Sequence, residues 1–430
     1  MDNTKKGMID ELGSDKLTFI SLFILLSLFI FGLQIKTISS LFLLVALVVS
    51  LFIKNKKIEL SLLFDMTLVF LFCFIYYSIM IEYRLTILSQ EMILISLNFC
   101  IAYYLGAVLS RIYNNLFVAL FIAILGCIIF SNLSVYNYIL FNGGSVRADS
   151  ILLDNRNVPS IWSSGDGGRV SATGIGLYLA LGISLISCIY STMNRLWKNC
   201  CITISLLSMV ATLAIQSRTP LYTGIIIVVF STLLYLTRTQ LTKKSIMKVF
   251  FVSSLIIAAS SIFASQLIEY ITSSPLFRRQ LESGVDDIRY RVWMVGIKGL
   301  FDYPLGGQKS DPMFAGYYHN LWLDIGWFGG ILPVVILIII QLKHVRYVFQ
   351  AIFPLKSYLV LGILLSFAAG MMLEPVMQGY TNYLILSFFV FGYIKYYARR
   401  NISRSKSIHK IENKDWIEAN GTQKSANNML

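Results

Sequence analysis

Long uninterrupted apolar blocks are the feature that most constrains the fold of this chain. The block FISLFILLSLFIFGL, residues 19–33, contains no charged residue. It also lacks the alternation of polar and apolar positions that a membrane β-strand shows. Of the 430 residues, 56% are hydrophobic and only 13% are charged, which excludes a water-soluble globule. The sequence therefore predicts an all-α, polytopic transmembrane helical bundle.

The apolar blocks divide the chain into candidate membrane spans, most of them long enough for a helix that crosses a bilayer in about 20 residues. Twelve stretches qualify, at 17–33, 37–53, 60–81, 92–109, 116–140, 171–191, 199–215, 221–237, 247–268, 319–341, 357–374 and 379–397. We expect one transmembrane domain over 1–397 and a basic cytoplasmic tail over 398–430 that is predicted to be disordered. The first block lacks a small-residue cleavage site, so it is interpreted as an uncleaved first helix.

Positive charge predicts the orientation of the chain in the membrane. With the N-terminus inside, 24 of the 36 Lys and Arg residues lie in inner loops and tails. The positive-inside rule therefore favours an even number of spans with both termini in the cytoplasm. The net charge of +14 is explained by this topology. It indicates the lipid bilayer, and not a nucleic acid, as the partner of the basic segments.

The kind of positive charge also differs between the two sides. Lysines outnumber arginines 17 to 7 inside, whereas arginines outnumber lysines 9 to 3 outside. The planar guanidinium suits bidentate binding of phosphate or carboxylate groups. The outer face is therefore predicted to hold an anion.

Several common cofactor and metal sites are not indicated. The six cysteines all fall in spans or at their inner ends, so neither a zinc site nor a disulfide framework is expected in the outer loops. The sequence contains no P-loop, no dinucleotide fingerprint and no HExxH motif. We expect neither a metal ion nor a cofactor.

Two outer loops are long enough to carry a site. The first, 141–170, is rich in glycine and contains Arg147, Arg156 and Arg169; it is either a flexible lid over a ligand or a tolerated insertion. The second covers 271–318.

The second loop contains a predicted amphipathic helix that begins near Ser283 and ends before Pro304. Its apolar positions recur at spacings of three and four residues, at Val285, Ile288, Val292, Val295 and Gly299. Arg289 and Arg291 then project from opposite flanks of the apolar stripe. They either hold an anion at headgroup depth or extend to the interface as ordinary snorkelling arginines.

The segment YYHNLWLDIGWFGG, residues 317–330, contains one of only three histidines in the chain. His319 is expected to start the tenth span, with Gly326 and Gly330 on its helical face, where they would let another backbone approach closely. It is either an interfacial residue or a base. Its neighbour Asn320 and the preceding arginine-bearing loop favour the base.

Three of these segments together resemble the bacterial O-antigen polymerase and ligase superfamily. The region shared by that superfamily has an arginine at the outer end of a helix, then an R…W…P..G.G segment, then HN followed by an apolar, glycine-bearing span. The matching segments are SRTPL with Arg218, RYRVWMVGIKGLFDYPLGG with Arg289 and Trp293, and HNLWLDIGWFGG with His319. They lie within about residues 210–340. The glycines follow the histidine about one helical turn sooner than in many members.

The resemblance implies a GT-C-like, metal-independent, inverting glycosyltransferase in the bacterial inner membrane, with its active site on the periplasmic face. The donor would be a glycan on undecaprenyl diphosphate, and a chain-length regulator is an expected partner. An imidazole is a base near neutral pH, so His319 would accept the proton of the attacking sugar hydroxyl. Arg289 and Arg218 would stabilise the diphosphate.

Further residues are predicted to bind substrate around this centre. Glu374, near an outer turn, is either an alternative base or a group that orients the acceptor. The remaining substrate-binding candidates are Arg291, Asn320, Arg84, Arg169 and Trp293.

Three functions remain open at this stage. A polymerase moves a growing glycan onto a new lipid-linked repeat, and its two lipid-linked substrates suit two sizeable outer loops. A ligase moves the finished glycan onto lipid A core. A flippase for the same lipid-linked repeats belongs to a different class, and it predicts ionisable residues within the membrane and an internal repeat.

Overall fold

The computed structural model describes residues 2–53, 59–86, 89–141, 157–162, 169–191, 193–215, 217–238, 288–312, 316–355 and 358–402. Apart from one small sheet, these residues form helices and short connections. The helices are α1 (Asp2–Gly32), α2 (Lys36–Leu51), α3 (Leu60–Glu82), α4 (Gln90–Ile112), α5 (Leu116–Phe141), α7 (Ala172–Ser184) with the 3-10 helix η1 (Leu185–Tyr190), α8 (Arg195–Ala214), α9 (Arg218–Arg238), α13 (Ile288–Asp302), α14 (Leu321–Gly329), α15 (Ile331–Leu355), α16 (Tyr358–Leu373) and α17 (Val376–Gly379). A last helix covers 381–402.

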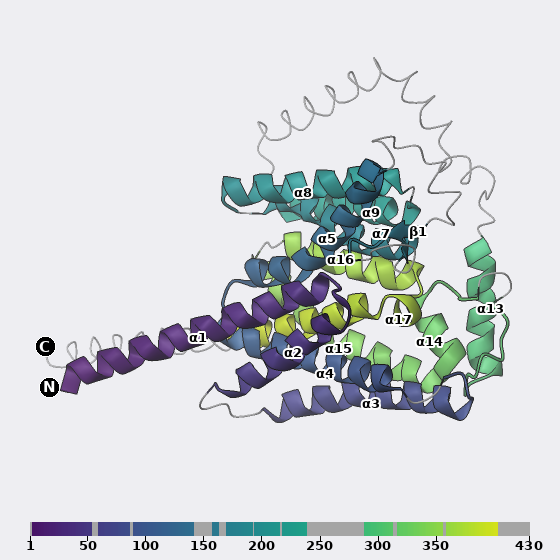
Figure 1. Ribbon diagram of the computed structural model, residues 1–430, viewed down its shortest axis with the longest axis horizontal. Helices are drawn as coiled ribbons and strands as arrows, with labels where there is room; N and C mark the ends of the chain where they lie inside the picture. Colours follow the sequence, from purple (N-terminus) through teal and green to yellow (C-terminus); the bar gives the residue numbers. More distant parts are fainter. Residues whose placement is uncertain are drawn as a thin grey trace, which may run out of the picture.

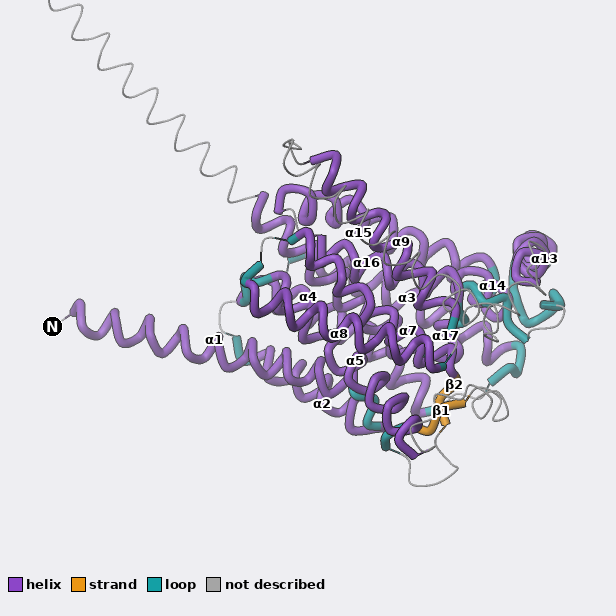
Figure 2. The backbone as a smooth tube through the Cα atoms, turned by 90° about the horizontal axis from the view of Figure 1, so that it is seen from above, coloured by secondary structure: helices purple, strands orange, loops and turns teal. Residues whose placement is uncertain are grey.

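The long helices run side by side as a bundle, and α13 lies across one end of it (Figures 1 and 2). Among the described residues, eight helices are long and apolar enough to cross a membrane. The predicted mostly helical, apolar architecture is therefore confirmed, and it is compatible with a multi-pass membrane protein. The predicted span at 247–268 lies outside the described residues.

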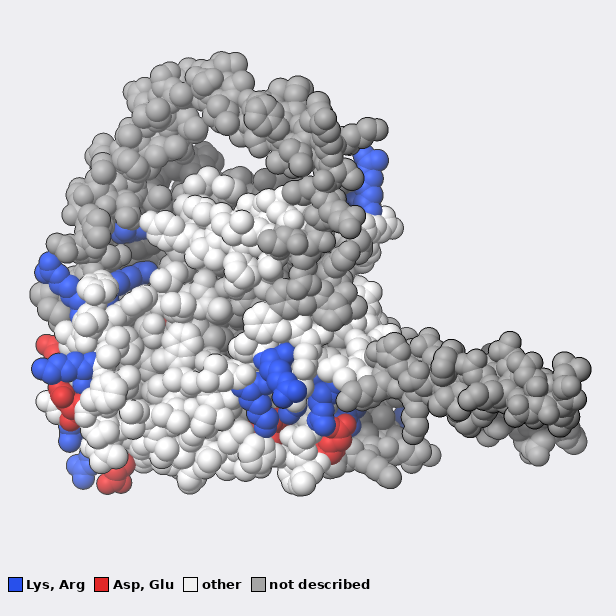
Figure 3. All heavy atoms as spheres, turned by 180° about the vertical axis from the view of Figure 1, so that it is seen from behind, with Lys and Arg blue, Asp and Glu red and all other residues white. Residues whose placement is uncertain are grey.

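The charge distribution on the surface agrees with this architecture. On the face shown in Figure 3, Lys and Arg side chains gather toward the two ends of the bundle, with a broad uncharged band between them. Many large apolar side chains are exposed, for example Phe74, Leu206 and Ile225. Exposed apolar side chains over such a band suit contact with lipid.

Small residues allow the helices of the bundle to pack closely. A Cβ at Gly126 of α5 would overlap the carbonyl oxygen of Phe29 in α1, and one at Gly106 of α4 would overlap that of Phe389 in the last helix. The reciprocal residue Gly392 meets the Tyr103 carbonyl in the same way. Such backbone contacts are typical of helices packed within a membrane.

The prediction of a single tenth span over 319–341 is wrong, because two helices cover these residues. Helix α14 ends at Gly329, and α15 begins at Ile331 and continues to Leu355. The break is at Gly330, whose φ of +76° is left-handed and favours glycine. With nine residues, α14 is too short to cross a bilayer, so His319 is not the start of a span.

The boundaries of the predicted loops and tail also differ from the structure. The last helix continues to residue 402, five residues beyond the predicted end of the domain, and 403–430 lie outside the described residues. From the first outer loop the structure describes a two-stranded antiparallel sheet, β1 (Asn157–Pro159) and β2 (Arg169–Ser171). Arg147 and Arg156 lie outside the described residues.

The sheet, α13, α14 and α17 share one end of the bundle, opposite the N-terminal end of α1 (Figure 1). We call this end the site end. An ionic cluster occupies the part of the bundle where α3, α15 and the last helix meet.

Asp65 is the centre of this ionic cluster and is 2% exposed. Its carboxylate is paired with Lys395, itself buried, and with Lys343 at 2.6 Å. It also accepts a hydrogen bond of 2.7 Å from the Tyr103 hydroxyl, which lies 2.8 Å from Nε2 of His344. Buried charges in an apolar bundle must be paired, and this carboxylate connects four helices.

Replacing Asp65 with Asn is expected to lower the stability of the detergent-solubilised protein strongly. The change leaves two ammonium groups together without their counter-charge, and losing one partner of a buried ion pair typically costs about 3–5 kcal/mol. Thermal unfolding of the purified variant measures the effect. Glu59→Gln is the matched control, because Glu59 is 44% exposed and pairs with Arg111 and Arg399 at the surface, where such pairs contribute about 0–1 kcal/mol. Equal midpoints for the two variants would contradict this assignment.

Candidate functional site

Two glycine-containing segments dock on each other at the site end. The residues after α13, Pro304 to Gln308, run along the end of α14: the N–H groups of Gly307 and Gln308 donate to the carbonyls of Phe328 and Trp327, and the N–H of Ile331 donates to the Pro304 carbonyl. A Cβ at Gly330 would overlap that same Pro304 oxygen, and one at Gly306 would meet the N atom of Gly330. The PLGG and GWFGG segments therefore belong to one structural unit.

Helix α13 is fixed to this unit by its buried side. The indole N–H of Trp293 donates to the Tyr318 carbonyl at 2.9 Å. The Tyr318 ring lies against Gly296, and its hydroxyl donates to Oγ of Ser310 at 2.7 Å. Val292 and Tyr318 are 1% exposed. The predicted amphipathic helix is confirmed from residue 288 onward. It positions Arg289 at the site end of the bundle, near Glu374.

His319 lies in the turn between this unit and α14. Its φ of +51° is left-handed, a conformation that is unfavourable for most residues and tends to occur where a fold needs it. The residues on both sides of it are held by one carboxylate. Oδ1 of Asp324 accepts from the Tyr318 N–H at 2.6 Å, and Oδ2 accepts from the Asn320 N–H at 3.2 Å.

Asp324 therefore acts as a clamp on the backbone that carries His319. It is fully buried. Burial raises the pKa of its carboxyl to about 7, even though the two N–H donors act in the opposite direction. The predicted helical relation between His319 and the glycines of α14 is wrong, because the histidine precedes the helix. Its orientation comes from the clamp.

Replacing Asp324 with Asn is expected to lower the glycan transfer that the motif resemblance implies by roughly tenfold or more. An amide has one acceptor oxygen in place of two, so one of the two backbone N–H donors loses its partner, and an unsatisfied buried donor costs about 1–3 kcal/mol. The assay is polymer formation per folded protein. Asp302→Asn serves as control, since Asp302 is half-exposed at the end of α13 and its ion pair with the exposed Lys298 is long, at 4.0 Å. Full activity of Asp324→Asn would exclude the clamp.

Glu374 is the buried anion of the site and is only 2% exposed. Its Oε1 accepts from the Thr219 hydroxyl at 2.5 Å and lies 3.7 Å from Nη2 of Arg289. Its Oε2 lies 3.6 Å from Nδ1 of His319. The carboxylate thus connects the histidine, the arginine of α13 and the start of α9.

Two buried polar atoms face each other in this centre. Within the described residues, neither Nδ1 of His319 nor Oε2 of Glu374 has a hydrogen-bond partner. A separation of 3.6 Å is within ion-pair range and too long for a good hydrogen bond. Hydrogen bonds in catalytic sites are often long without substrate and shorten in the complex. The pair can therefore close on a substrate, with Glu374 accepting from Nδ1 and Nε2 left as the basic nitrogen.

The other predicted arginines are distributed around this centre. Arg218 is the first residue of α9 and is half-buried, next to the Thr219 that binds Glu374. Arg291 is exposed on α13. Arg84 is exposed in the turn after α3, where its neighbour Tyr83 packs on Gly307. Arg169 lies in β2 and lines a separate pocket.

Two predicted substrate-binding side chains have structural hydrogen bonds. The Asn320 side-chain oxygen caps α14 by accepting from the N–H groups of Trp322 and Leu323, and its amide nitrogen donates to the Met372 carbonyl. Trp293 is bound to the Tyr318 carbonyl, as described above. Both hold the walls of the site in place.

Sequence reasoning missed Thr219 as a residue of the centre. Thr219 follows Arg218 directly, so its place at the same helix start was a usable signal. Helical geometry placed Asp324 behind the site, away from the face of His319, whereas its clamp on the His319 backbone depends on the non-helical turn there. Within the described residues, no group of three or more His, Cys, Asp or Glu side chains is placed to hold a metal ion.

Comparison with protein-family models and with curated proteins finds no match for this chain.

Proposed function

We propose that the protein is a membrane glycosyltransferase that transfers a glycan from undecaprenyl diphosphate to a sugar hydroxyl on the periplasmic face, as an O-antigen polymerase does. The observation that carries the proposal is the convergence of His319 and Arg289 on the buried carboxylate of Glu374. A base, a guanidinium and a buried carboxylate that orients both are the groups that this reaction needs. The resemblance in the three motif segments supports the same class and a GT-C-like bundle.

The proposed reaction gives each of these groups one task. The oxygen of the acceptor hydroxyl attacks the anomeric carbon from the side opposite the diphosphate, and the bond from that carbon to the diphosphate oxygen breaks. The acceptor proton passes to Nε2 of His319, while Glu374 stabilises the imidazolium that forms. Arg289 stabilises the negative charge that develops on the leaving diphosphate. Arg218 lies at the start of α9, next to the Thr219 that binds Glu374. The product is a glycan with inverted configuration at the new bond.

A deletion strain separates the polymerase from the ligase. Loss of a polymerase leaves lipid A core capped by single repeats, whereas loss of a ligase leaves core without O-antigen. We expect the first pattern, restored by the wild-type gene and not by a His319 variant. The second pattern would assign the chain to ligation.

A flippase is the second candidate, and the buried ionic cluster at Asp65 favours it. Ionisable groups inside a membrane bundle often mark a transport path. The two functions respond to different substitutions. A flippase should tolerate His319→Asn, whereas a glycosyltransferase should need His319 in detergent, where there is no compartment to transport across.

A further inference from the structure

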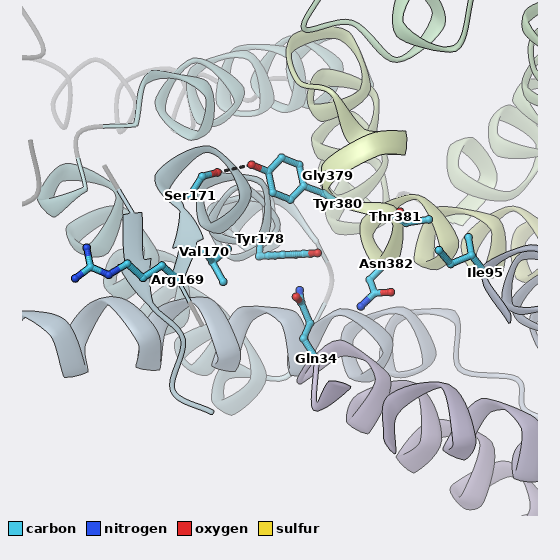
Figure 4. A pocket seen from close by; sticks show the side chains of 10 residues that line it. All are labelled: Gln34, Ile95, Arg169, Val170, Ser171, Tyr178, Gly379, Tyr380, Thr381 and Asn382. Carbon is cyan, nitrogen blue, oxygen red and sulfur yellow. Dashed lines mark hydrogen bonds between the residues drawn. The ribbon is translucent and has the colours of Figure 1, made fainter. Parts of the chain in front are cut away.

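A cavity separate from the His319–Glu374 centre opens at the site end. It has a volume of about 480 Å³ and lies between the α1–α2 turn, β2, α7 and the residues that follow α17 (Figure 4). This volume is within the range of small-molecule sites. Seven of its ten lining residues have polar side chains, which is unusual for a cavity in so apolar a chain.

Three of these polar side chains come from different elements and extend toward the same space. They are Gln34 from the α1–α2 turn, Tyr178 from α7 and Asn382 from the last helix (Figure 4). Nε2 of Gln34 is buried and makes no hydrogen bond of normal geometry within the described residues, although the Gln34 amide lies near enough to the Tyr178 hydroxyl to interact with it. Because an incompletely satisfied buried donor is costly, this atom points to a ligand that accepts a hydrogen bond.

The cavity has little positive charge of its own. Among the described residues, Arg169 is the one charged residue that lines the cavity, and Figure 4 shows the guanidinium extending away from Gln34 and Asn382. A diphosphate would need cations that face it. Amide groups and a tyrosine hydroxyl instead both donate to and accept from hydroxyl groups, and the faces of Tyr178 and Tyr380 offer apolar surface for carbon-bound hydrogens.

The cavity is connected to the carboxylate site by one short segment. Helix α17 begins two residues after Glu374 and ends at Gly379, which lines the cavity. The next residue, Tyr380, packs on Gly174, and its hydroxyl is hydrogen-bonded to that of Ser171 in β2. Gln378 donates to the Tyr76 hydroxyl at 3.1 Å. A group held in the cavity is thereby placed at a fixed distance from Glu374.

We propose that this cavity binds a neutral sugar unit of the acceptor glycan and so positions the attacking hydroxyl at the His319–Glu374 pair. The inference rests on the proposed function and names a binding subsite for its acceptor. Gln34 and Asn382 bind sugar hydroxyls, and Tyr178 and Tyr380 pack against the ring.

Photo-crosslinking tests the subsite without turnover. The full-length protein carries His319→Asn to prevent transfer and p-benzoylphenylalanine either at Ile95, which lines the cavity, or at Leu97, which is 45% exposed on the same helix. The probe is the radiolabelled repeat unit released from its lipid by mild acid. We expect labelling at 95 to exceed that at 97 by roughly tenfold, the effect of about 1.4 kcal/mol of binding energy.

Variants of the lining residues provide the second arm. Asn382→Leu and Gln34→Gly should each lower the labelling at 95 by about three- to tenfold, the effect of one hydrogen bond. Glycine is chosen because Gln34 has a φ of +58°, which glycine adopts without strain. Equal labelling at 95 and 97, or adducts with phospholipid alone, would overturn the subsite. If the cavity is labelled but the wild-type protein does not transfer glycans, the subsite is retained and the proposed function is rejected.

Discussion

Replacing His319 with Asn is expected to lower glycan transfer by about 10²- to 10⁴-fold, the usual contribution of a positioned general base. Asparagine tolerates the left-handed backbone better than most residues, so the variant separates loss of the base from backbone strain. It cannot take the acceptor proton. The measurement is the rate of elongation of a lipid-linked repeat by purified protein, normalised to folded protein.

Gln308→Asn is the matched control for this variant. Gln308 also has a left-handed backbone, with a φ of +57°, and is exposed in the segment that docks on α14. We expect its activity to stay within a few-fold of wild type. A His319→Asn protein as active as this control would remove His319 from the mechanism.

Replacing Arg289 with Ala is expected to lower transfer by about 10²- to 10³-fold, the cost of losing one preorganised donor to a developing anion. Arg289 faces Glu374 at 3.7 Å. Its loss also removes one of the cations near the buried carboxylate. Arg289→Lys should recover only part of the rate, because an ammonium lacks the bidentate geometry of guanidinium.

Arg291→Ala provides the comparison within the same helix. Arg291 lies two residues away and is exposed, so its removal should change the rate by only a few-fold. The ratio of the two variants, measured at saturating substrate, distinguishes a site arginine from an interfacial one. Similar losses for both would indicate that α13 acts through its net charge at the membrane surface.

The sequence was most informative where a local pattern decides the structure. Apolar length located most of the helices, and the three- and four-residue spacing located α13 around Val292 and Gly299. Residue chemistry and the motif resemblance also singled out His319, Arg289 and Glu374. These three side chains meet in the structure although Arg289 and Glu374 are 85 positions apart in the chain.

The sequence was misleading where tertiary contacts override a local pattern. The apolar run from His319 onward reads as one span, yet Gly330 breaks it because the Pro304 carbonyl takes the space of a side chain. Asn320 is predicted to bind substrate, and the sequence did not predict that its side chain caps α14. The clamp of Asp324, the Thr219–Glu374 hydrogen bond and the Gln34 cavity all depend on long-range packing, which no spacing rule encodes.

The most direct test of the central claim is elongation of a lipid-linked repeat by the purified protein in detergent with a chelator present. We predict a ladder of glycans from the wild-type chain and from Gln308→Asn, and only the starting repeat from His319→Asn. A ladder of equal length from His319→Asn, or no elongation by a folded wild-type protein given its lipid-linked substrate, would contradict the account.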